Sequence, residues 1–381
     1  MRVLIVLTYY RPHISGLTIY AERLARGLVR RGHTVTVLTS RFDAGLAAHE
    51  VLHGVEVVRV PVALQIGKGV LMPRFPGYAR RLIRAHDAVN IHMPQLEAAL
   101  LAGLGRRQGA RVVATYHCDL RLPPGPFNRA VEWGVRPLNH LAAALAHRVV
   151  VSTRDYAAHS AFLRAHTGKV EEIAPPIDLA PPDPVVTERL AARWGFDGRP
   201  HIGFASRFAA EKGVEHLLAA LPRVAEQIPQ VRVAVTGGAA GAVGEAAYYE
   251  RLRPLLRQQH ERLVLLDRLA DEEMASFFRL CDVVTVTSTN STEAFGMVQV
   301  EAMLAGTPVV ATDLPGVREV VRRTGMGETV PVGDVTALVE ALVRVLRRRD
   351  DYVRPRETIA SVFSLERSLR HYECLFAAPG G

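Results

Sequence analysis

Residues 288–313 read STNSTEAFGMVQVEAMLAGTPVVATD, and with the residues before them they predict a strand–loop–helix–strand unit. The preceding run 283–287 is short and rich in β-branched residues, which predicts a buried parallel strand. A polar loop follows, and residues 297–304 then place apolar side chains at helical spacing. Residues 306–308 read GTP and end that helix before the next apolar run. The loop-to-helix junction therefore lies at the carboxyl end of a strand, where open α/β sheets bind ligands.

Two carboxylates bracket this junction. Glu293 lies in the loop just before the helix, and Glu301 lies within it. A carboxylate in the loop can accept hydrogen bonds from sugar hydroxyls, and one on the helix can bind a ribose diol. The N–H groups near Phe295, Gly296 and Met297 suit an anion at the start of the helix. The alternative interpretation is an ordinary βαβ unit with one surface glutamate and one helix glutamate.

The stretch 293–310 resembles the signature of the retaining glycosyltransferases of family GT4, usually written E-x-F-G-x4-E-A-x-x-x-G-x-P-V. Here it stands as E-A-F-G-M-V-Q-V-E-A-M-L-A-G-T-P-V-V, and every fixed position is matched. The resemblance implies the GT-B fold, in which two Rossmann-like, doubly wound parallel-sheet α/β domains face each other across a cleft. It also implies the transfer of a sugar from a nucleotide-diphosphate sugar to an acceptor hydroxyl.

Length and composition predict a globular protein of two domains. The 381 residues exceed the size at which one hydrophobic core keeps growing, and 22% charged residues are typical of a globular chain. No stretch approaches the ~20 apolar residues of a membrane span, and the N-terminal apolar run lacks a cleavage pattern. Cys118, Cys281 and Cys374 are far apart and in no metal-binding spacing, which favours reduced thiols. We therefore expect a cytoplasmic protein.

Positive charge is concentrated in the first half of the chain. Residues 1–180 contain 23 Lys+Arg and 12 Asp+Glu, whereas the whole chain has a net charge of only +9. This surface could bind anionic lipid head groups, a phosphorylated acceptor or nucleic acid, and the alternative is an arginine-rich composition without a partner. The stretches 64–78 and 121–137 mix Pro and Gly with apolar and basic side chains. We expect loops there that form a membrane-surface patch or cover an amphipathic acceptor, and the alternative is a pair of surface loops that pack on the domain.

The alternation of apolar runs and helical segments predicts two doubly wound sheets. A cluster of prolines at 175–184 cannot form a helix interior, so the domain boundary is predicted near residue 180. The first domain would span 1–180 on the acceptor side, and the second would span 181–363 and bind the nucleotide sugar. Residues 364–376 predict an amphipathic helix, which in GT-B proteins packs back on the first domain. The strands expected in the first domain are 3–8, 34–39, 55–60, 88–92, 112–117 and 148–152.

Two residues of the first domain are candidates for binding the sugar donor. Gly16 lies near a helix start after the first strand, where backbone N–H groups can approach an anion. The loop contains no G-x-G-x-x-G, which argues against a dinucleotide-binding dehydrogenase. His117 follows the strand 112–115, and the resemblance implies contact with the donor sugar near the reacting carbon. The alternative for His117 is a structural role, and His92 after the preceding strand can line the same cleft.

Residues 206–213, SRFAAEKG, place two cations between a strand and a helix of the second domain. Arg207 supplies a planar fork and Lys212 a compact point charge, and a pair five residues apart can bind a diphosphate. The stretch resembles the GT4 pattern G-R-x4-K-G, with Ser206 in place of the first glycine. The alternative is a pair of solvated loop charges.

The resemblance implies a retaining, hexosyltransferase-like glycosyltransferase, and we expect it to act in cell-envelope glycan or glycolipid synthesis. The predicted catalytic residues are His117, Arg207, Lys212 and Glu293. The main chemical task is to stabilise the charge on the diphosphate leaving group, and the two cations with the helix start can do so. The predicted donor-binding residues are Gly16, Arg207, Lys212, Glu293, Phe295, Gly296, Met297 and Glu301.

The expected partners follow from the same resemblance. The donor is a nucleotide-diphosphate sugar, and the acceptor is a sugar, a polyprenyl-linked sugar or a lipid. No metal or other cofactor is expected, since the family is metal-independent and the loops contain no Asp-x-Asp element. The sequence contains no helix-turn-helix, RNP or zinc pattern, so nucleic acid is not expected as a partner. Two alternatives stay open: a GT-B phosphorylase or another nucleotide-sugar-using enzyme, and a non-catalytic polyanion-binding protein.

Overall fold

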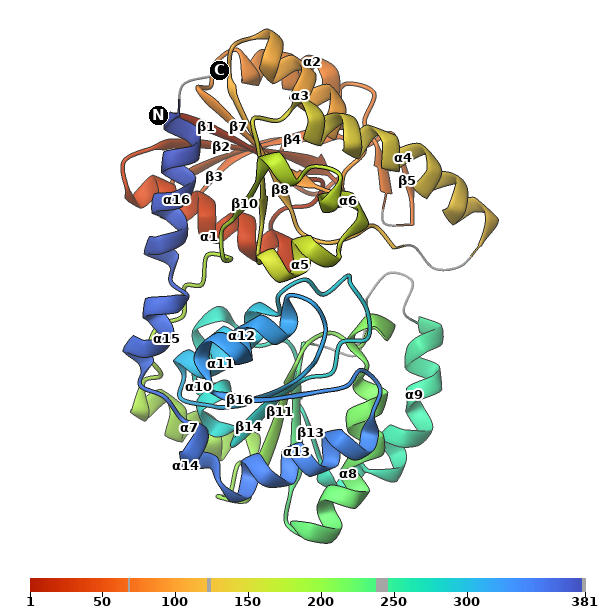
Figure 1. The fold of residues 1–381 in the computed structure, drawn as a ribbon, viewed down its shortest axis with the longest axis vertical. Coiled ribbons are helices and arrows are strands. Elements are labelled where there is room, and N and C mark those ends of the chain that lie inside the picture. Colours follow the sequence, from red (N-terminus) through yellow and green to blue (C-terminus); the bar gives the residue numbers. More distant parts are fainter. Residues whose placement is uncertain (68, 122–124, 238–245, 379–381) are drawn as a thin grey trace. The chain divides into compact units, whose positions relative to one another are not determined.

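The computed structural model describes residues 1–67, 69–121, 125–237 and 246–378, and the chain forms two compact units (Figure 1). The N-terminal unit comprises Met1–Ile177 and Ser364–Gly381, and the C-terminal unit comprises Asp178–Phe363. Lys68 and residues 122–124, which belong to the two stretches with expected membrane-facing loops, lie outside the described residues. Each unit is built on one main β-sheet with helices packed against it.

The sheet of the N-terminal unit has the strand order β10-β9-β8-β7-β1-β2-β4-β3, and only β3 runs antiparallel to its neighbour. The central strands are almost wholly buried because they are continuous β-branched and aliphatic runs, as parallel strands covered on both faces must be. A separate antiparallel hairpin joins β5 (Leu64–Ile66) to β6 (Gly69–Leu71). The strands of the sheet are β1 (Arg2–Val6), β2 (Thr34–Arg41), β3 (His49–Leu52), β4 (Val55–Pro61), β7 (Ala88–Met93), β8 (Arg111–Tyr116), β9 (Arg148–Val151) and β10 (Val170–Glu172).

The helices of this unit connect successive strands and cover the sheet. Ser15 caps the first of them, because its Oγ accepts a hydrogen bond of 3.2 Å from the N–H of Thr18. The α3 helix packs against both α2 and α4. The helical segments are α1 (Gly16–Arg30), α2 (Phe75–Ile83), α3 (Ala98–Arg107), α4 (Pro126–Leu145), α5 (Arg154–His159), α6 (Ala161–Arg164), η1 (Thr167–Lys169) and α16 (Leu365–Ala377).

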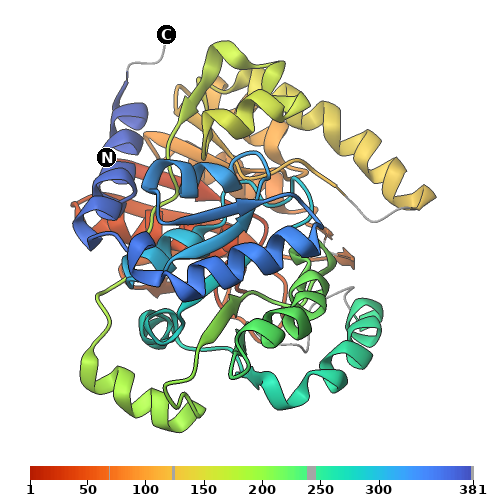
Figure 2. The ribbon, with the colours of Figure 1, turned by 60° about the horizontal axis from the view of Figure 1, so that its bottom comes forward.

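The expectation of loops in the proline-containing stretches was wrong in two places. Residues 64–78 contain the β5–β6 hairpin and the start of α2, and residues 126–137 form the first half of α4. Pro126 is compatible with a helix because it lies in the first turn, where its missing N–H would have no partner. Pro137 lies inside α4. The first half of α4 projects beyond the other helices of its own unit in both Figures 1 and 2.

The last helix, α16, packs against α1 and β8 of the N-terminal unit. Gly27 of α1 makes this packing close, since a Cβ there would lie 2.7 Å from Cδ1 of Leu369. The Tyr372 hydroxyl lies 2.7 Å from that of Tyr20 and 2.8 Å from Oγ1 of Thr115. These buried hydrogen bonds join α16, α1 and β8, so α16 forms part of the N-terminal core.

The sheet of the C-terminal unit is wholly parallel, in the order β13-β12-β11-β14-β15-β16. The strands are β11 (His201–Ala205), β12 (Arg232–Thr236), β13 (Leu263–Leu265), β14 (Val283–Val286), β15 (Val309–Thr312) and β16 (Gly327–Val330). The helical segments are α7 (Pro184–Trp194), η2 (Ala210–Lys212), α8 (Val214–Gln227), α9 (Ala246–Gln258), η3 (His260–Arg262), α10 (Asp271–Leu280), α11 (Met297–Leu304), α12 (Val317–Thr324), α13 (Val335–Arg347), α14 (Arg349–Tyr352) and α15 (Arg356–Val362). With both sheets doubly wound, the predicted α/β fold class is confirmed.

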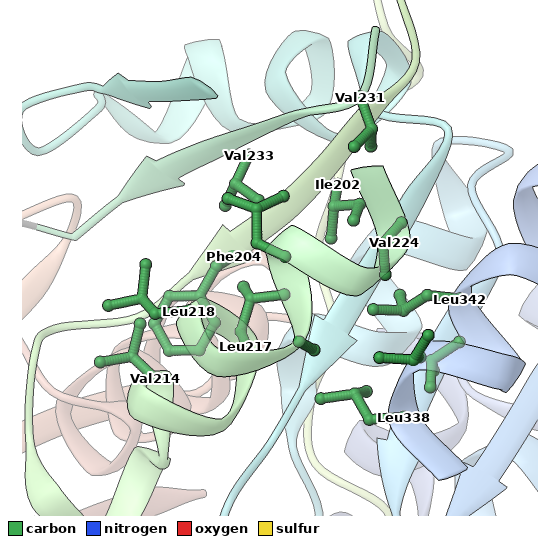
Figure 3. Packing of buried hydrophobic residues seen from close by; sticks show 14 of the residues in the cluster. Ile202, Phe204, Val214, Leu217, Leu218, Val224, Val231, Val233, Leu338 and Leu342 are labelled. Carbon is green, nitrogen blue, oxygen red and sulfur yellow. The ribbon is translucent and has the colours of Figure 1, made fainter. Parts of the chain in front are cut away.

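A hydrophobic cluster between this sheet and the helices α8 and α13 forms the core of the C-terminal unit (Figure 3). Leu217 and Val224 of α8 are buried beside Ile202 of β11, and Leu342 of α13 completes the layer. Packing of α8 against the sheet fixes the loop that precedes it. That loop carries the predicted diphosphate-binding cations.

Candidate active site

The candidate donor site lies where the order in which strands are added to the C-terminal sheet reverses. After β11 the chain adds β12 and β13 on one side, and it then returns to place β14 on the other side of β11. The carboxyl ends of two such strands form the edge where open α/β sheets bind ligands. The loop 206–213 follows β11 and the loop 287–296 follows β14. Both predicted motifs therefore lie at this one edge.

The two loops meet in an ion pair between Lys212 and Glu293. Nζ of Lys212 lies 2.5 Å from Oε2 of Glu293, and the two side chains are 24% and 17% exposed. Ser288 donates a hydrogen bond of 3.4 Å from its Oγ to the same carboxylate oxygen. A cation and a carboxylate are thus held together at the strand ends, where one can bind phosphate and the other a sugar hydroxyl.

Hydrogen bonds to the backbone carbonyls of Glu211 and Lys212 fix the position of Lys212 relative to the β14 loop. Thr287 donates from Oγ1 to the carbonyl oxygen of Lys212 at 2.9 Å, and Thr289 donates from its N–H to the carbonyl of Glu211 at 2.9 Å. Gly213 has φ +61°, and a Cβ there would lie 2.3 Å from the carbonyl oxygen of Thr287. Only glycine allows both the left-handed backbone and this close approach.

Arg207 lies at the start of the same loop and pairs with Glu211. Its Nη2 lies 2.5 Å from Oε1 of Glu211, and the arginine side chain is 37% exposed. Ser206, which replaces the glycine of the GT4 pattern, has no positive φ and therefore does not need glycine. The glycine that lets two backbone segments approach closely here is Gly237. It has φ +118°, and a Cβ there would lie 2.5 Å from the carbonyl carbon of Ser206. Serine is therefore compatible with this loop.

The start of α11 presents backbone N–H groups at the same strand ends. Gly296 is the N-cap residue with φ +74°, and no side chain caps the helix. The first N–H groups of α11 are consequently not satisfied by a capping side chain, and an anion can bind them. The Phe295 side chain is only 3% exposed and contacts Phe363 edge-on at 5.5 Å between centroids. Glu301 is 7% exposed, one turn beyond Met297, and its role towards a ribose stays a prediction.

Gly16 and His117 belong to the N-terminal unit. Gly16 is the exposed first residue of α1, next to the capping Ser15. His117 directly follows β8, and its N–H donates a hydrogen bond of 3.0 Å to the carbonyl of Met93. Its Nε2 lies 2.8 Å from Nδ1 of His92. His92 is only 1% exposed and contacts His117, and its place beside the cleft stays a prediction.

Burial controls the charge of both histidines. It lowers the pKa of His117 from 6.5 to about 3. It also lowers the pKa of His92 well below 6.5, and the neighbouring His117 lowers it further. Both rings are therefore neutral at pH 7.

Several residues of these two regions were not predicted from the sequence. Glu211 forms an ion pair with Arg207, and Ser288 donates a hydrogen bond to Glu293. In the N-terminal unit, Tyr20 contacts both His92 and His117 edge-on. The sequence contains a signal that could have identified Glu211, because this residue lies between the two motif cations Arg207 and Lys212. The sequence contains no such signal for Tyr20, since only the folded sheet brings α1 to β7 and β8. Among the described residues, no three His, Cys, Asp or Glu side chains are grouped as metal ligands would be.

Two family models match most of the sequence. Residues 186–361 match the family described as glycosyl transferases group 1. Residues 15–176 match the glycosyl transferase 4-like domain. The two matched ranges correspond to the C-terminal and N-terminal units.

Curated relatives match over nearly the full length. The chain is 27% identical to the GDP-mannose-dependent alpha-(1-6)-phosphatidylinositol monomannoside mannosyltransferase of Mycolicibacterium smegmatis, covering 89% of this chain and 88% of the relative. It is 28% identical to the phosphatidyl-myo-inositol mannosyltransferase of Mycobacterium tuberculosis, covering 96% and 93%. Among solved structures, HepE of Anabaena in complex with UDP superposes with a TM-score of 0.78 at 22% identity, covering 98% of each chain. This last likeness concerns the fold.

Proposed function

Because the chain belongs to the glycosyl transferases group 1, we propose that it transfers mannose from GDP-mannose to a hydroxyl of an inositol- or sugar-bearing lipid. It is a glycosyltransferase that uses a nucleotide sugar, in keeping with cell-envelope glycolipid synthesis. GDP-mannose is proposed because both reported relatives are named as mannosyltransferases and one as GDP-mannose-dependent. The lipid acceptor is proposed because both names include phosphatidylinositol.

The ion pair between Lys212 and Glu293 carries the proposal for the donor site. It holds a cation and a sugar-binding carboxylate together at the strand ends, between two loops that match the family signature. In this proposal Lys212 and Arg207 bind the diphosphate, and the N–H groups at the start of α11 bind it as well. Glu293 accepts hydrogen bonds from the sugar hydroxyls, and Glu301 binds the ribose.

The proposed reaction proceeds with retention at the anomeric carbon. The bond between that carbon and the diphosphate oxygen breaks, and the negative charge on the leaving group increases. The acceptor hydroxyl oxygen forms its bond to the same face of the carbon, and its proton passes to the leaving diphosphate. Lys212, Arg207 and the helix start stabilise this charge more strongly in the transition state than in the bound donor, which is the condition for catalysis. His117 contacts the sugar near the reacting carbon, and Gly16 contributes a backbone N–H to the donor. No metal is required in this proposal.

The first test is a thermal-shift panel with UDP-, GDP-, ADP- and TDP-sugars. GDP-mannose should raise the melting temperature with concentration, because a ligand that binds only the folded state stabilises it. Glu293→Ala should lose the part of the shift that the sugar adds beyond GDP. Transfer of mannose to phosphatidylinositol in the presence of EDTA then tests two points: the identity of the acceptor and the independence of the reaction from metal ions. Stabilisation by another nucleotide alone would overturn the choice of GDP, and loss of transfer in EDTA would overturn metal independence.

The same assay separates the proposal from the two alternatives. A phosphorylase would release or form a sugar phosphate with inorganic phosphate. A non-catalytic polyanion-binding protein would be stabilised by heparin or DNA and by no nucleotide sugar. The family membership favours neither alternative.

We further propose that the N-terminal unit docks on an anionic membrane through α4. The exposed stripe of this helix is apolar at helical spacing, and Trp133 within it is 86% exposed. Exposed arginines flank the stripe at Arg129 and Arg136. An amphipathic helix with a tryptophan on its apolar face and arginines beside it suits the interface of an anionic bilayer. The exposed stripe consists of Ala130, Trp133, Pro137, Leu141 and Ala144.

Neighbouring elements extend this surface. The α2 helix packs on α3, which also packs on α4, and α2 with its two cap residues exposes four arginines: Arg74, Arg80, Arg81 and Arg84. The hairpin β5–β6 exposes Leu64 and Leu71. No helix in the described part of the chain is long and apolar enough to span a bilayer. A peripheral location at the inner face of the membrane is part of the proposal, which rests on the exposed apolar stripe and arginines of α4.

Trp133 offers a direct test, because the chain has only two tryptophans. In Trp194→Phe protein the fluorescence comes from Trp133 alone. Vesicles of phosphatidylcholine with phosphatidylglycerol should shift this emission to the blue, and brominated lipid should quench it. Arg129→Glu with Arg136→Glu should weaken binding, whereas the exposed pair Arg257→Glu with Arg347→Glu in the C-terminal unit should not. Absence of a shift, or equal binding to pure phosphatidylcholine, would overturn membrane docking.

A further inference from the structure

His92 and His117 lie on the same face of the N-terminal sheet. The register pairs His92 of β7 with Thr115 of β8, and His117 follows two residues later, so the strand period places both side chains together. Nδ1 of His92 lies 2.8 Å from Nε2 of His117. The ring planes are 22° apart and the centroids 5.0 Å apart. An N–H of one ring can therefore point towards the lone pair of the other.

This contact requires one proton between the two nitrogens, and two placements are possible. Either His92 carries it on Nδ1 and donates, or His117 carries it on Nε2 and donates. Both rings are neutral, because burial lowers the pKa of each. Each ring consequently holds a single proton. The position of the shared proton then determines the tautomer of both rings.

The surroundings of the second nitrogen of His92 decide between the two placements. Its Nε2 is buried, and no described residue forms a hydrogen bond with it. If His117 were the donor, His92 would carry its proton on this Nε2, as a buried N–H without a partner. Buried N–H groups without partners are rare in native proteins. If His92 is the donor, Nε2 presents only a lone pair.

We propose that His92 donates from Nδ1 and thereby holds His117 in the tautomer protonated on Nδ1. His117 then has an N–H on its other side, where it makes no hydrogen bond with the described residues. This group can donate to a substrate oxygen, but it has no lone pair to accept a proton. His117 is thus a hydrogen-bond donor in the reaction and not a general base. His92 is a positioning residue that acts through His117, and this consequence rests on the proposed function.

Tyr20 fixes the orientation of the pair. Its ring contacts His117 edge-on at 4.9 Å and His92 edge-on at 5.8 Å between centroids. The Tyr20 hydroxyl is held by that of Tyr372 at 2.7 Å, which in turn contacts Thr115. The hydrogen-bonded tyrosines restrict the rotation of both imidazoles. A fixed ring orientation is the condition for a defined tautomer.

The direct test is a long-range ¹H–¹⁵N correlation spectrum of protein labelled with ¹⁵N-histidine at pH 7. Protonated and bare ring nitrogens differ in their ¹⁵N shifts, and His117→Gln and His92→Asn assign the two rings among the 15 histidines. Both rings are expected to be protonated on Nδ1. Protonation of either ring on Nε2 would overturn the proposal. The measurement needs neither sugar donor nor acceptor, so it does not depend on the proposed function.

Two matched variants test the positioning role. His92→Asn retains an N–H close to the position of Nδ1, whereas His92→Asp offers only acceptor oxygens. With GDP-mannose, His92→Asn should keep the tautomer of His117 and most of kcat. His92→Asp should move the proton of His117 to Nε2 and lower kcat roughly 10–100-fold, the range for losing an outer partner of a functional histidine, with KM little changed. A wild-type kcat in His92→Asp protein with the switched tautomer would overturn the role. Absence of transfer by the wild type would count against the proposed function alone.

Discussion

Nζ of Lys212 lies 2.5 Å from Oε2 of Glu293, although 81 residues separate them in the chain. The parallel sheet brings them together, because β11 and β14 are neighbours and both loops leave at their carboxyl ends. The pair is partly buried, so solvent screens it less than a surface ion pair.

Lys212→Ala and Glu293→Ala should each lower turnover by a factor of ~10²–10³, the size seen when one group that stabilises the transition state is removed. Steady-state transfer from GDP-mannose measures the effect. Arg223→Ala, an exposed arginine on α8 outside the site, is the control and should leave turnover unchanged. Near-normal turnover in both site variants would show that the donor site was wrongly assigned.

Gly213→Ala should lower the free energy of unfolding more than an ordinary glycine substitution does. The alanine would carry a strained φ of +61° and place its Cβ 2.3 Å from the Thr287 carbonyl oxygen, so the two loops must separate. Gly195→Ala is the matched control, because Gly195 has φ +72° and no atom within 4 Å of its Cβ position. The control should lose only the ~1–2 kcal/mol of a left-handed non-glycine residue. Urea unfolding measures both, and equal losses of stability would contradict the close contact.

Much of the fold could be predicted because its signals are local. Apolar spacing predicted a helix over 297–304, and the structure has α11 at Met297–Leu304. The α4 helix was missed because its prolines suggested loops. In the structure Pro126 occupies the first turn, and Pro137 lies in an exposed part of the helix, where water can bind the carbonyl that it leaves unpaired.

The site could be predicted only as separate motifs. Each motif places its charged residue at the end of a strand, but no sequence signal pairs Lys212 with Glu293 or His92 with His117. These pairs follow from strand order and register, which are long-range properties of the sheet. Tyr372 shows the same limit, since its hydroxyl partner Tyr20 lies 352 residues away.

Tyr372→Phe should destabilise the protein by about 1–3 kcal/mol, because it leaves the buried Tyr20 hydroxyl without a partner, whereas Thr115 keeps its hydrogen bond from Asn90. The lost bonds are those to Tyr20 at 2.7 Å and to Thr115 at 2.8 Å. Tyr78→Phe is the control, since the Tyr78 hydroxyl makes no hydrogen bond within the described part of the chain. Urea unfolding followed by circular dichroism compares the two. A loss no larger than in the control would mean that the hydroxyl cluster does not hold α16.

Stability should fall as the pH decreases below 6.5, and His117 should contribute to the fall. Burial lowers its pKa to about 3 in the folded protein, whereas the unfolded chain titrates near 6.5. Between these values the unfolded state binds a proton that the folded state does not, so the free energy of unfolding rises with pH across this window. One such group contributes up to about 1.4 kcal/mol per pH unit. His117→Gln should therefore show a shallower decrease between pH 7 and pH 5 in urea unfolding. An unchanged slope would indicate that His117 titrates alike in the folded and unfolded chain.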